Sequence, residues 1–173
     1  MISNLGHVSN INGTRVISPS GRGRNLYTML HQKLTPQQTY IVSLAPDDEI
    51  LASLNQFVKD QQIKSGYIIG IGAVKSARLG HYSVKSKRYT ERKIKKPMEL
   101  VNLTGIITTG KVHLHATLGT QMFQTFSGHL AGAVISAACE IIIVETKEEV
   151  KRKKDEAVGL ELLNLKNNQV TRC

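Results

Sequence analysis

The segment Lys111-Val112-His113-Leu114-His115-Ala116-Thr117-Leu118 alternates between apolar and polar side chains. Because successive side chains of a β-strand point to opposite faces, one face of this segment would be apolar and the other would carry His113, His115 and Thr117. The alternation predicts a half-buried strand. Imidazoles at positions i and i+2 of a strand have Cα atoms roughly 6–7 Å apart, since a strand rises about 3.3 Å per residue. Both rings could therefore reach a single ion.

A third imidazole, that of His129, follows after an expected hairpin through Gly119 and Gly128. The returning strand would bring this ring beside the first two. Three neutral imidazoles with a fourth position open are typical of catalytic zinc sites. A harder ion would need carboxylate or carbonyl oxygens, and no aspartate lies near this segment to supply them. The alternative is that the His-x-His pair is a surface feature or a buried polar pair. His81 is a candidate for a contact that supports the ligands.

The rest of the chain predicts one helix and several strands. Runs of apolar, β-branched and aromatic residues predict strands over residues 40–44, 67–74, 77–83, 98–107, 112–118, 121–126 and 133–144. Pro46, the carboxylates after it and apolar residues at helical spacing predict a helix over residues 47–63. Gly70 and Gly72, two apart in a strand pattern, indicate a bulge or the close approach of another backbone. One helix among antiparallel strands predicts an α+β fold.

The chain is divided into three parts by its composition. Its 173 residues correspond to about one domain, for which roughly 100–200 residues are usual. Serine, asparagine, glycine and proline break any periodic pattern in residues 1–38, which we interpret as an N-terminal arm. Residues 39–165 are the predicted domain, and residues 166–173 are a C-terminal tail.

Composition excludes several classes of protein. Hydrophobic residues make up 40% and charged residues 21%, which argues against a disordered or fibrous chain. No run of about 18 apolar residues is present, so we expect no transmembrane helix, and the first residues do not resemble a signal peptide. The cysteines, Cys139 and Cys173, form no CxxC pair, which favours a reducing, cytoplasmic setting. Cys139 lies in an apolar run and is expected to be a small buried hydrophobe.

Positive charge is in excess and clustered. Lysine and arginine total 23 against 13 aspartates and glutamates, a net charge of +10 that attracts polyanions. A basic cluster lies within residues 85–96 and consists of Lys85, Lys87, Arg88, Arg92, Lys93, Lys95 and Lys96. A second run covers residues 151–154. Such cations could contact phosphates without regard to sequence, although charge runs are usually solvated surface.

Short motifs, in order, carry a resemblance to a known family. They are Gly70-Ile71-Gly72-Ala73-Val74, Ala77-Arg78-Leu79-Gly80, Pro97-Met98-Glu99-Leu100, Leu103-Thr104-Gly105, Val112-His113-Leu114-His115-Ala116 and Gly128-His129-Leu130. Their order and spacing resemble those of the plants-and-prokaryotes conserved (PPC) domain family over about residues 38–165. The family's usual Gly-Gly-His-Leu is here Ser127-Gly128-His129-Leu130, a departure that keeps the histidine.

The resemblance implies an α+β domain, mostly antiparallel sheet with one main helix, that assembles as a homotrimer. It also implies that His113, His115 and His129 correspond to a metal site of bacterial and archaeal members. The family is similar in fold to acetolactate decarboxylase, in which zinc sits on three histidines. Plant members carry minor-groove-binding arms built around Arg-Gly-Arg-Pro. This chain has Arg22-Gly23-Arg24 without the proline. The segment is therefore a candidate for a minor-groove-binding arm, and the alternative is a flexible charged linker.

Three hypotheses of function follow. The favoured hypothesis is a non-enzymatic, regulatory protein that associates with DNA through Arg22, Arg24, Lys85, Lys87 and Arg88 and carries a metal on its histidines. One alternative is a zinc-dependent enzyme acting on a small oxo-acid-like substrate; another is a small-molecule sensor.

For the enzymatic alternative, Glu99 is the candidate acid or base, although a structural role suits it equally.

Overall fold

The computed structural model describes residues 8–11, 14–17, 29–165 and 170–171. The chain divides into two compact units, residues 32–166 and the two ends of the chain, 1–31 with 167–173. In the second of these units, antiparallel pairs join β1 (Val8–Ile11) to β2 (Thr14–Ile17) and β3 (Met29–Leu30) to β12 (Val170–Thr171). The predicted boundaries after residues 38 and 165 stay predictions.

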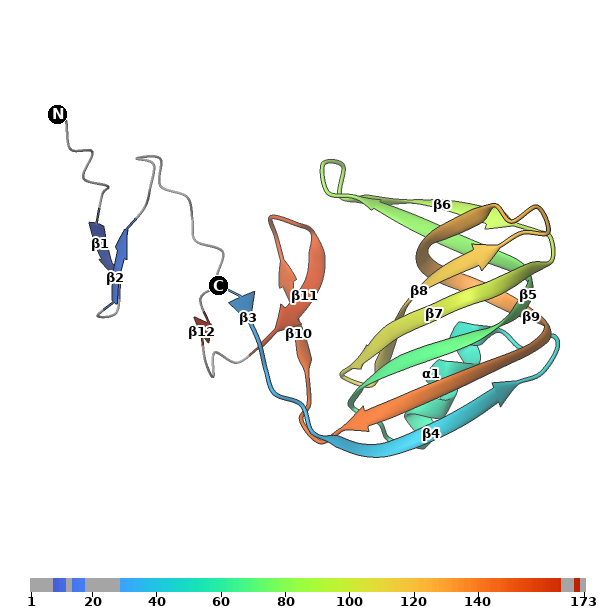
Figure 1. Cartoon of the computed structure of the whole chain (residues 1–173), viewed down its shortest axis with the longest axis horizontal. Coiled ribbons are helices and arrows are strands. Elements are labelled where there is room, and N and C mark those ends of the chain that lie inside the picture. Colours follow the sequence, from blue (N-terminus) through green and yellow to red (C-terminus); the bar gives the residue numbers. More distant parts are fainter. Residues whose placement is uncertain (1–7, 12–13, 18–28, 166–169, 172–173) are drawn as a thin grey trace. The chain divides into compact units, whose positions relative to one another are not determined.

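The larger unit is built on one antiparallel sheet (Figure 1). Its strands are β4 (Pro36–Leu44), β5 (Ser65–Ser83), β6 (Arg88–Ile94), β7 (Met98–Thr108), β8 (Lys111–Gly119) and β9 (Thr125–Thr146). They are ordered β4-β9-β8-β7-β5-β6, and β5 also pairs with β9, so the ladder from β5 through β7 and β8 to β9 closes on itself. A separate hairpin joins β10 (Lys151–Asp155) to β11 (Leu160–Asn164).

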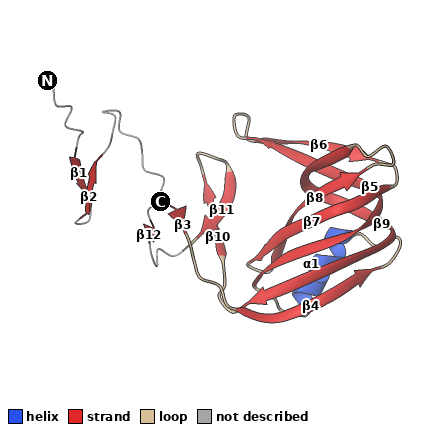
Figure 2. Cartoon of the chain, in the orientation of Figure 1, coloured by secondary structure: helices blue, strands red, loops and turns tan. Residues whose placement is uncertain are grey.

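One helix, α1 (Ile50–Asp60), packs against β8 and β9 (Figure 2). The predicted mostly antiparallel sheet with one helix is confirmed, and the helix is shorter than the predicted 47–63. Glu49 has an extended backbone and its carboxylate accepts the N–H of Ala52, which makes it the N-cap. At the other end Gln62 has a φ of 57°, outside the helical region.

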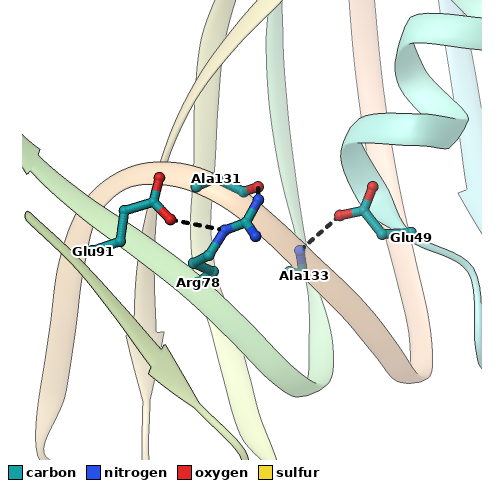
Figure 3. Close-up of polar contacts among 5 residues, drawn as sticks. All are labelled: Glu49, Arg78, Glu91, Ala131 and Ala133. Atoms are coloured by element: carbon teal, nitrogen blue, oxygen red, sulfur yellow. Dashed lines mark hydrogen bonds and ion pairs between the residues drawn. The ribbon is translucent and has the colours of Figure 1, made fainter. Parts of the chain in front are cut away.

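Glu49 also ties the helix to the sheet (Figure 3). Its second carboxylate oxygen accepts the N–H of Ala133 on β9 at 2.8 Å. Close by, Arg78 of β5 pairs through Nε with Glu91 of β6 at 3.1 Å and donates to the carbonyl of Ala131 at 2.7 Å. The same short stretch of β9 thus holds the helix, β5 and β6 together.

The core lies between α1 and the inner face of the sheet. Its largest fully buried side chains are Ile50, Leu54, Ile63, Ile68, Leu100, Leu103, Ile107, Leu114, Leu118, Leu130, Ile135 and Ile141. Leu114, Ala116 and Leu118 are buried, as the alternation of β8 predicts. Cys139 is also buried, with 0% exposure, which confirms the prediction of a small buried hydrophobe. The histidine-bearing face of β8 therefore points away from the core.

Strand β5 runs without a break where the sequence predicts two strands, 67–74 and 77–83. Its pairing register shifts between Gly70 and Gly72 against β7, and three more times against β9. A Cβ on Gly72 would lie 2.6 Å from the carbonyl oxygen of Ala138, so glycine here allows β9 to approach closely, as predicted. Within the described parts of the chain, no helix has the length and apolarity needed to cross a membrane.

Candidate metal centre

Three histidines converge on the face of the sheet opposite the core. His113 and His115 lie two apart on β8, and His129 of β9 pairs directly with His115. Ring centroids are 5.4 Å apart for His113 and His115, 5.0 Å for His113 and His129, and 5.6 Å for His115 and His129. The hairpin return predicted from the sequence therefore brings the third ring beside the other two.

The donor set fits a metal ion. One nitrogen from each ring lies within 4.8 Å of the other two. In tetrahedral zinc, with Zn–N bonds of about 2.0–2.1 Å, ligand nitrogens are roughly 3.3 Å apart. The side chains would have to rotate to close the remaining gap. The role of these residues as ligands stays a prediction.

The surroundings of His113 and His129 favour the neutral form of these two imidazoles. Burial, followed by the charges of His129, Arg152 and His115, lowers the pKa of His113 from 6.5 to about 4. Burial and His115 also lower the pKa of His129, while Glu91 opposes this shift. Metal ligation requires an unprotonated nitrogen, so the neutral form is the competent one.

His129 has a nitrogen for which the described residues provide no partner. Its Nδ1 atom is buried and makes no hydrogen bond there, while its ring packs against Tyr89 with centroids 5.2 Å apart. A buried polar atom without a partner costs about 1–3 kcal/mol. A ligand or an ion bound at this position would remove that cost, which is a second observation in favour of an occupied site.

Arg152 is a member of this site that the sequence analysis missed. From β10 its Nη2 donates to Nδ1 of His113 at 3.1 Å, and its Nε donates to Oγ1 of Thr108 at 3.0 Å. Its Nη1 donates to the carbonyl of Glu161 on β11 at 2.7 Å. In the sequence Arg152 is one of four consecutive cations, and only the docking of the β10–β11 hairpin distinguishes it from them.

Two other residues singled out from the sequence lie elsewhere. Gly80 pairs with His129, so the next residue, His81, points to the opposite face, and its side chain is exposed. Glu99 lies five residues along β7 from Thr104, the partner of His115, which is about 16 Å at 3.3 Å per residue. Neither residue is part of the histidine cluster.

The predicted DNA-contacting residues fall in two places. Lys85, Lys87 and Arg88 lie together at the tip of the β5–β6 hairpin and are exposed. Arg22 and Arg24 lie outside the described residues.

The basic cluster of residues 85–96 keeps its positive charge. All seven of its cations are exposed, and none forms an ion pair with any residue that the structure describes. The carboxylate within the cluster, Glu91, pairs with Arg78 of β5. In the second run, by contrast, Lys151 pairs with Glu149 and Lys154 with Glu156. The unbalanced charge is therefore concentrated on the β5–β6 hairpin and the turn after it.

Several known proteins resemble this chain in sequence and in fold. The family model of the Plants and Prokaryotes Conserved (PCC) domain matches residues 31–147. A candidate DNA-binding protein from Bacteroides thetaiotaomicron is 32% identical, with a TM-score of 0.71 over 76% of this chain and 97% of that one. A metal-containing protein from Archaeoglobus fulgidus is 27% identical, with a TM-score of 0.72 over 78% of this chain and 99% of that one.

A plant- and prokaryote-conserved (PPC) protein from Pyrococcus horikoshii is 28% identical, with a TM-score of 0.73 over 79% of this chain and 97% of that one. Among curated proteins, the bifunctional protein GlmU of a Synechococcus strain is 26% identical over 125 residues, 70% of this chain and 20% of GlmU. The chain thus spans about a fifth of the length of the curated relatives it matches.

Proposed function

Because the chain belongs to the Plants and Prokaryotes Conserved domain family, we propose that it is a regulatory protein that associates with DNA as a homotrimer and holds zinc on three histidines. The observation that carries the DNA part is the unpaired positive charge of the β5–β6 region. Cations of this kind attract phosphates at long range. The candidate DNA-binding function named for the Bacteroides relative supports the same proposal.

Contacts from two regions would combine on DNA. Lys85, Lys87 and Arg88 would meet backbone phosphates, which position a protein without reading sequence. Arg22 and Arg24 of the proposed arm would enter a narrow, A·T-rich minor groove, where the potential is most negative.

The test is binding of a labelled DNA duplex, followed by fluorescence anisotropy at several salt concentrations. We expect the triple variant Lys85→Gln, Arg88→Gln, Lys93→Gln to bind more weakly at low salt. The slope of log K against log salt should become shallower by about 2–3, because each phosphate contact contributes about 0.9. Lys87 is left in place because its Nζ donates to the carbonyl of Glu156 at 2.6 Å.

The matched control removes the same charge elsewhere. Lys59, Lys64 and Lys111 are also exposed but lie outside the basic cluster. The variant Lys59→Gln, Lys64→Gln, Lys111→Gln should keep the wild-type slope. Equal losses in both variants, or no binding by the wild-type chain at low salt, would overturn the DNA proposal.

The metal part is supported by the convergence of the three rings and by the orphaned nitrogen of His129. His113, His115 and His129 would hold the ion, which would supply Lewis acidity or fix a ligand in place. We expect the purified chain to retain about one zinc per chain after dialysis, and His113→Ala to retain far less. If elemental analysis finds equally negligible zinc in the wild-type chain and in His113→Ala, the metal proposal is refuted.

The trimer is supported by an exposed apolar stripe across four strands, β4, β9, β5 and β7. Ile41 of β4 and Ile69 of β5 both pair with Ile142 of β9, and Ile71 and Val101 lie in the same shallow groove. Contiguous apolar surface of this kind marks association sites. We propose that second and third copies of the chain cover it.

In a second group of candidate functions, the same three histidines form a catalytic or ligand-binding site. The zinc-dependent enzyme acting on a small oxo-acid-like substrate, and the small-molecule sensor, are both favoured by the cationic Arg152 beside the histidines. Turnover or ligand binding at the metal-loaded site would distinguish these from a purely structural ion. The cytoplasmic location stays a proposal based on sparse cysteine.

A further inference from the structure

The β10–β11 hairpin brings Arg152 to the histidine cluster from outside the segment that defines the family. The family model ends at residue 147, and β10 begins at Lys151. Arg152 nonetheless donates to Thr108 and to His113, a predicted ligand. Arg152 therefore reaches the histidines from a hairpin that lies outside the segment matched by the family model.

The contact between Arg152 and His113 is incompatible with metal ligation by His113. An arginine side chain has only donors, so Nδ1 of His113 must present its lone pair to Nη2. In a neutral imidazole the proton then sits on Nε2. A ligand nitrogen needs a free lone pair, so neither nitrogen of this ring is available while the hydrogen bond persists. Ligation by His113 must release Nη2 of Arg152.

Once Nη2 has left His113, the guanidinium would have an N–H without an acceptor and a positive charge without an anionic partner. Arg152 is half-buried, and its hydrogen-bond partners Thr108, Glu161 (through the carbonyl) and His113 offer it no negative charge. It forms no ion pair with the residues that the structure describes. A divalent ion nearby would add more positive charge. An anion with an oxygen acceptor is the group that satisfies both the freed N–H and the excess charge.

The hairpin is anchored independently of this contact. At its base the N–H of Val150 donates to Oγ of Ser65 at 2.6 Å, and at its turn the hydroxyl of Tyr82 donates to the carbonyl of Val158 at 2.8 Å. The contact from Lys87 to Glu156 holds the same turn. The Arg152 side chain can therefore change partner while the hairpin stays in place.

The geometry points to a composite site for a metal ion and a small oxyanion, in which Arg152 transfers its hydrogen bond from His113 to the anion. The ligand class is a carboxylate or a phosphoryl group, both of which offer the oxygen acceptor that Nη2 lacks after ligation. The inference rests on the metal part of the proposed function and gives the site a ligand class.

The test measures zinc affinity of the full chain by competition with a chromophoric chelator. Arg152→Met keeps an apolar stem and removes the donor. Without oxyanion we expect this variant to bind zinc about three- to tenfold more tightly than wild type, because the competing hydrogen bond is gone. Acetate or methylphosphonate, at constant ionic strength, should tighten wild-type zinc binding about fivefold or more and the variant less than about twofold.

Lys153→Met removes one charge from the same strand and should behave as wild type. Tightening by acetate alone or by methylphosphonate alone identifies the carboxylate or the phosphoryl group as the ligand. Zinc binding that is the same in wild type and Arg152→Met, with the same response to both anions, overturns the inference and leaves the metal proposal standing. Absence of zinc binding by wild type overturns the metal proposal itself, and the composite site with it.

Discussion

His113 couples the stability of the metal-free protein to pH. Its pKa is about 4 in the folded chain against an ordinary 6.5, with burial as the main cause. As the pH falls from about 6.5 towards 4, the unfolded chain takes up a proton that the folded chain resists. Stability is therefore retained above this window and lost within it. We expect the melting temperature, measured by circular dichroism with a chelator present, to fall less in His113→Gln than in wild type.

A histidine outside the cluster provides the control for that measurement. His81 is exposed, so His81→Gln removes an imidazole without altering the site. Its pH profile should follow that of wild type. An identical fall in all three proteins would show that His113 does not contribute to the acid sensitivity.

Cys139 should be chemically inert in the folded chain. Its thiol is buried, and burial, with a smaller effect of Glu140, raises its pKa to about 11. Because the thiolate is the reactive form, we expect no alkylation of Cys139 by iodoacetamide at mildly alkaline pH, and rapid alkylation in denaturant. Peptide mass spectrometry distinguishes it from Cys173. Modification at the same rate with and without denaturant would contradict the buried placement.

Individual residues differ in how far the sequence reveals them. The histidine cluster could be predicted because strand alternation and one hairpin place all three rings, and both are local patterns. Arg152 could not, since its contact with His113 spans 39 positions and depends on how a separate hairpin docks. A run of four cations contains no signal for which one turns inward.

At the scale of elements, Glu49 joins the start of α1 to β9. Its carboxylate accepts N–H groups from Ala52 and from Ala133. We expect Glu49→Ala to lower the free energy of unfolding in urea by about 1–3 kcal/mol, because it removes an N-cap and leaves the N–H of Ala133 without its acceptor. Glu49→Gln should lower the free energy of unfolding less, because its amide oxygen can still accept one of the two N–H groups.

The control for Glu49 is Glu99, an exposed glutamate on strand β7. Glu99→Ala should change the unfolding free energy by less than about 0.5 kcal/mol, as is usual for surface substitutions. If Glu49→Ala costs no more than Glu99→Ala, the carboxylate does not secure the helix.

The sequence predicts the types of the elements better than their boundaries. The predicted helix included residues 47–49 because acidic residues favour a first turn, whereas Glu49 uses its carboxylate as the cap instead. The sequence pattern predicts two strands where β5 is one, because register shifts disturb the alternation of its side chains. A bulge is set by the partner strand, which a local pattern does not contain.

For the whole molecule, charge and apolar surface lie on different parts of the sheet. The basic cluster occupies the β5–β6 hairpin and the turn after it, and the apolar stripe crosses β4, β9, β5 and β7. The homotrimer is implied by the family resemblance alone, because no pattern within a single chain specifies how many copies meet. Three copies joined through the stripe would leave the cations free and multiply the positive field that attracts DNA.

The stripe can be tested without disturbing the core. Ile71 is 58% exposed, so Ile71→Lys leaves folding intact, but it would place a charge in the proposed interface, where burial without a partner is strongly unfavourable. We expect light scattering after size exclusion to give wild type about three times the mass of one chain and Ile71→Lys the mass of one. Val84, 57% exposed on the β5–β6 turn and outside the stripe, supplies the control Val84→Lys, which should remain a trimer. A wild-type monomer, or a trimer that survives Ile71→Lys, would show that this face does not join the copies.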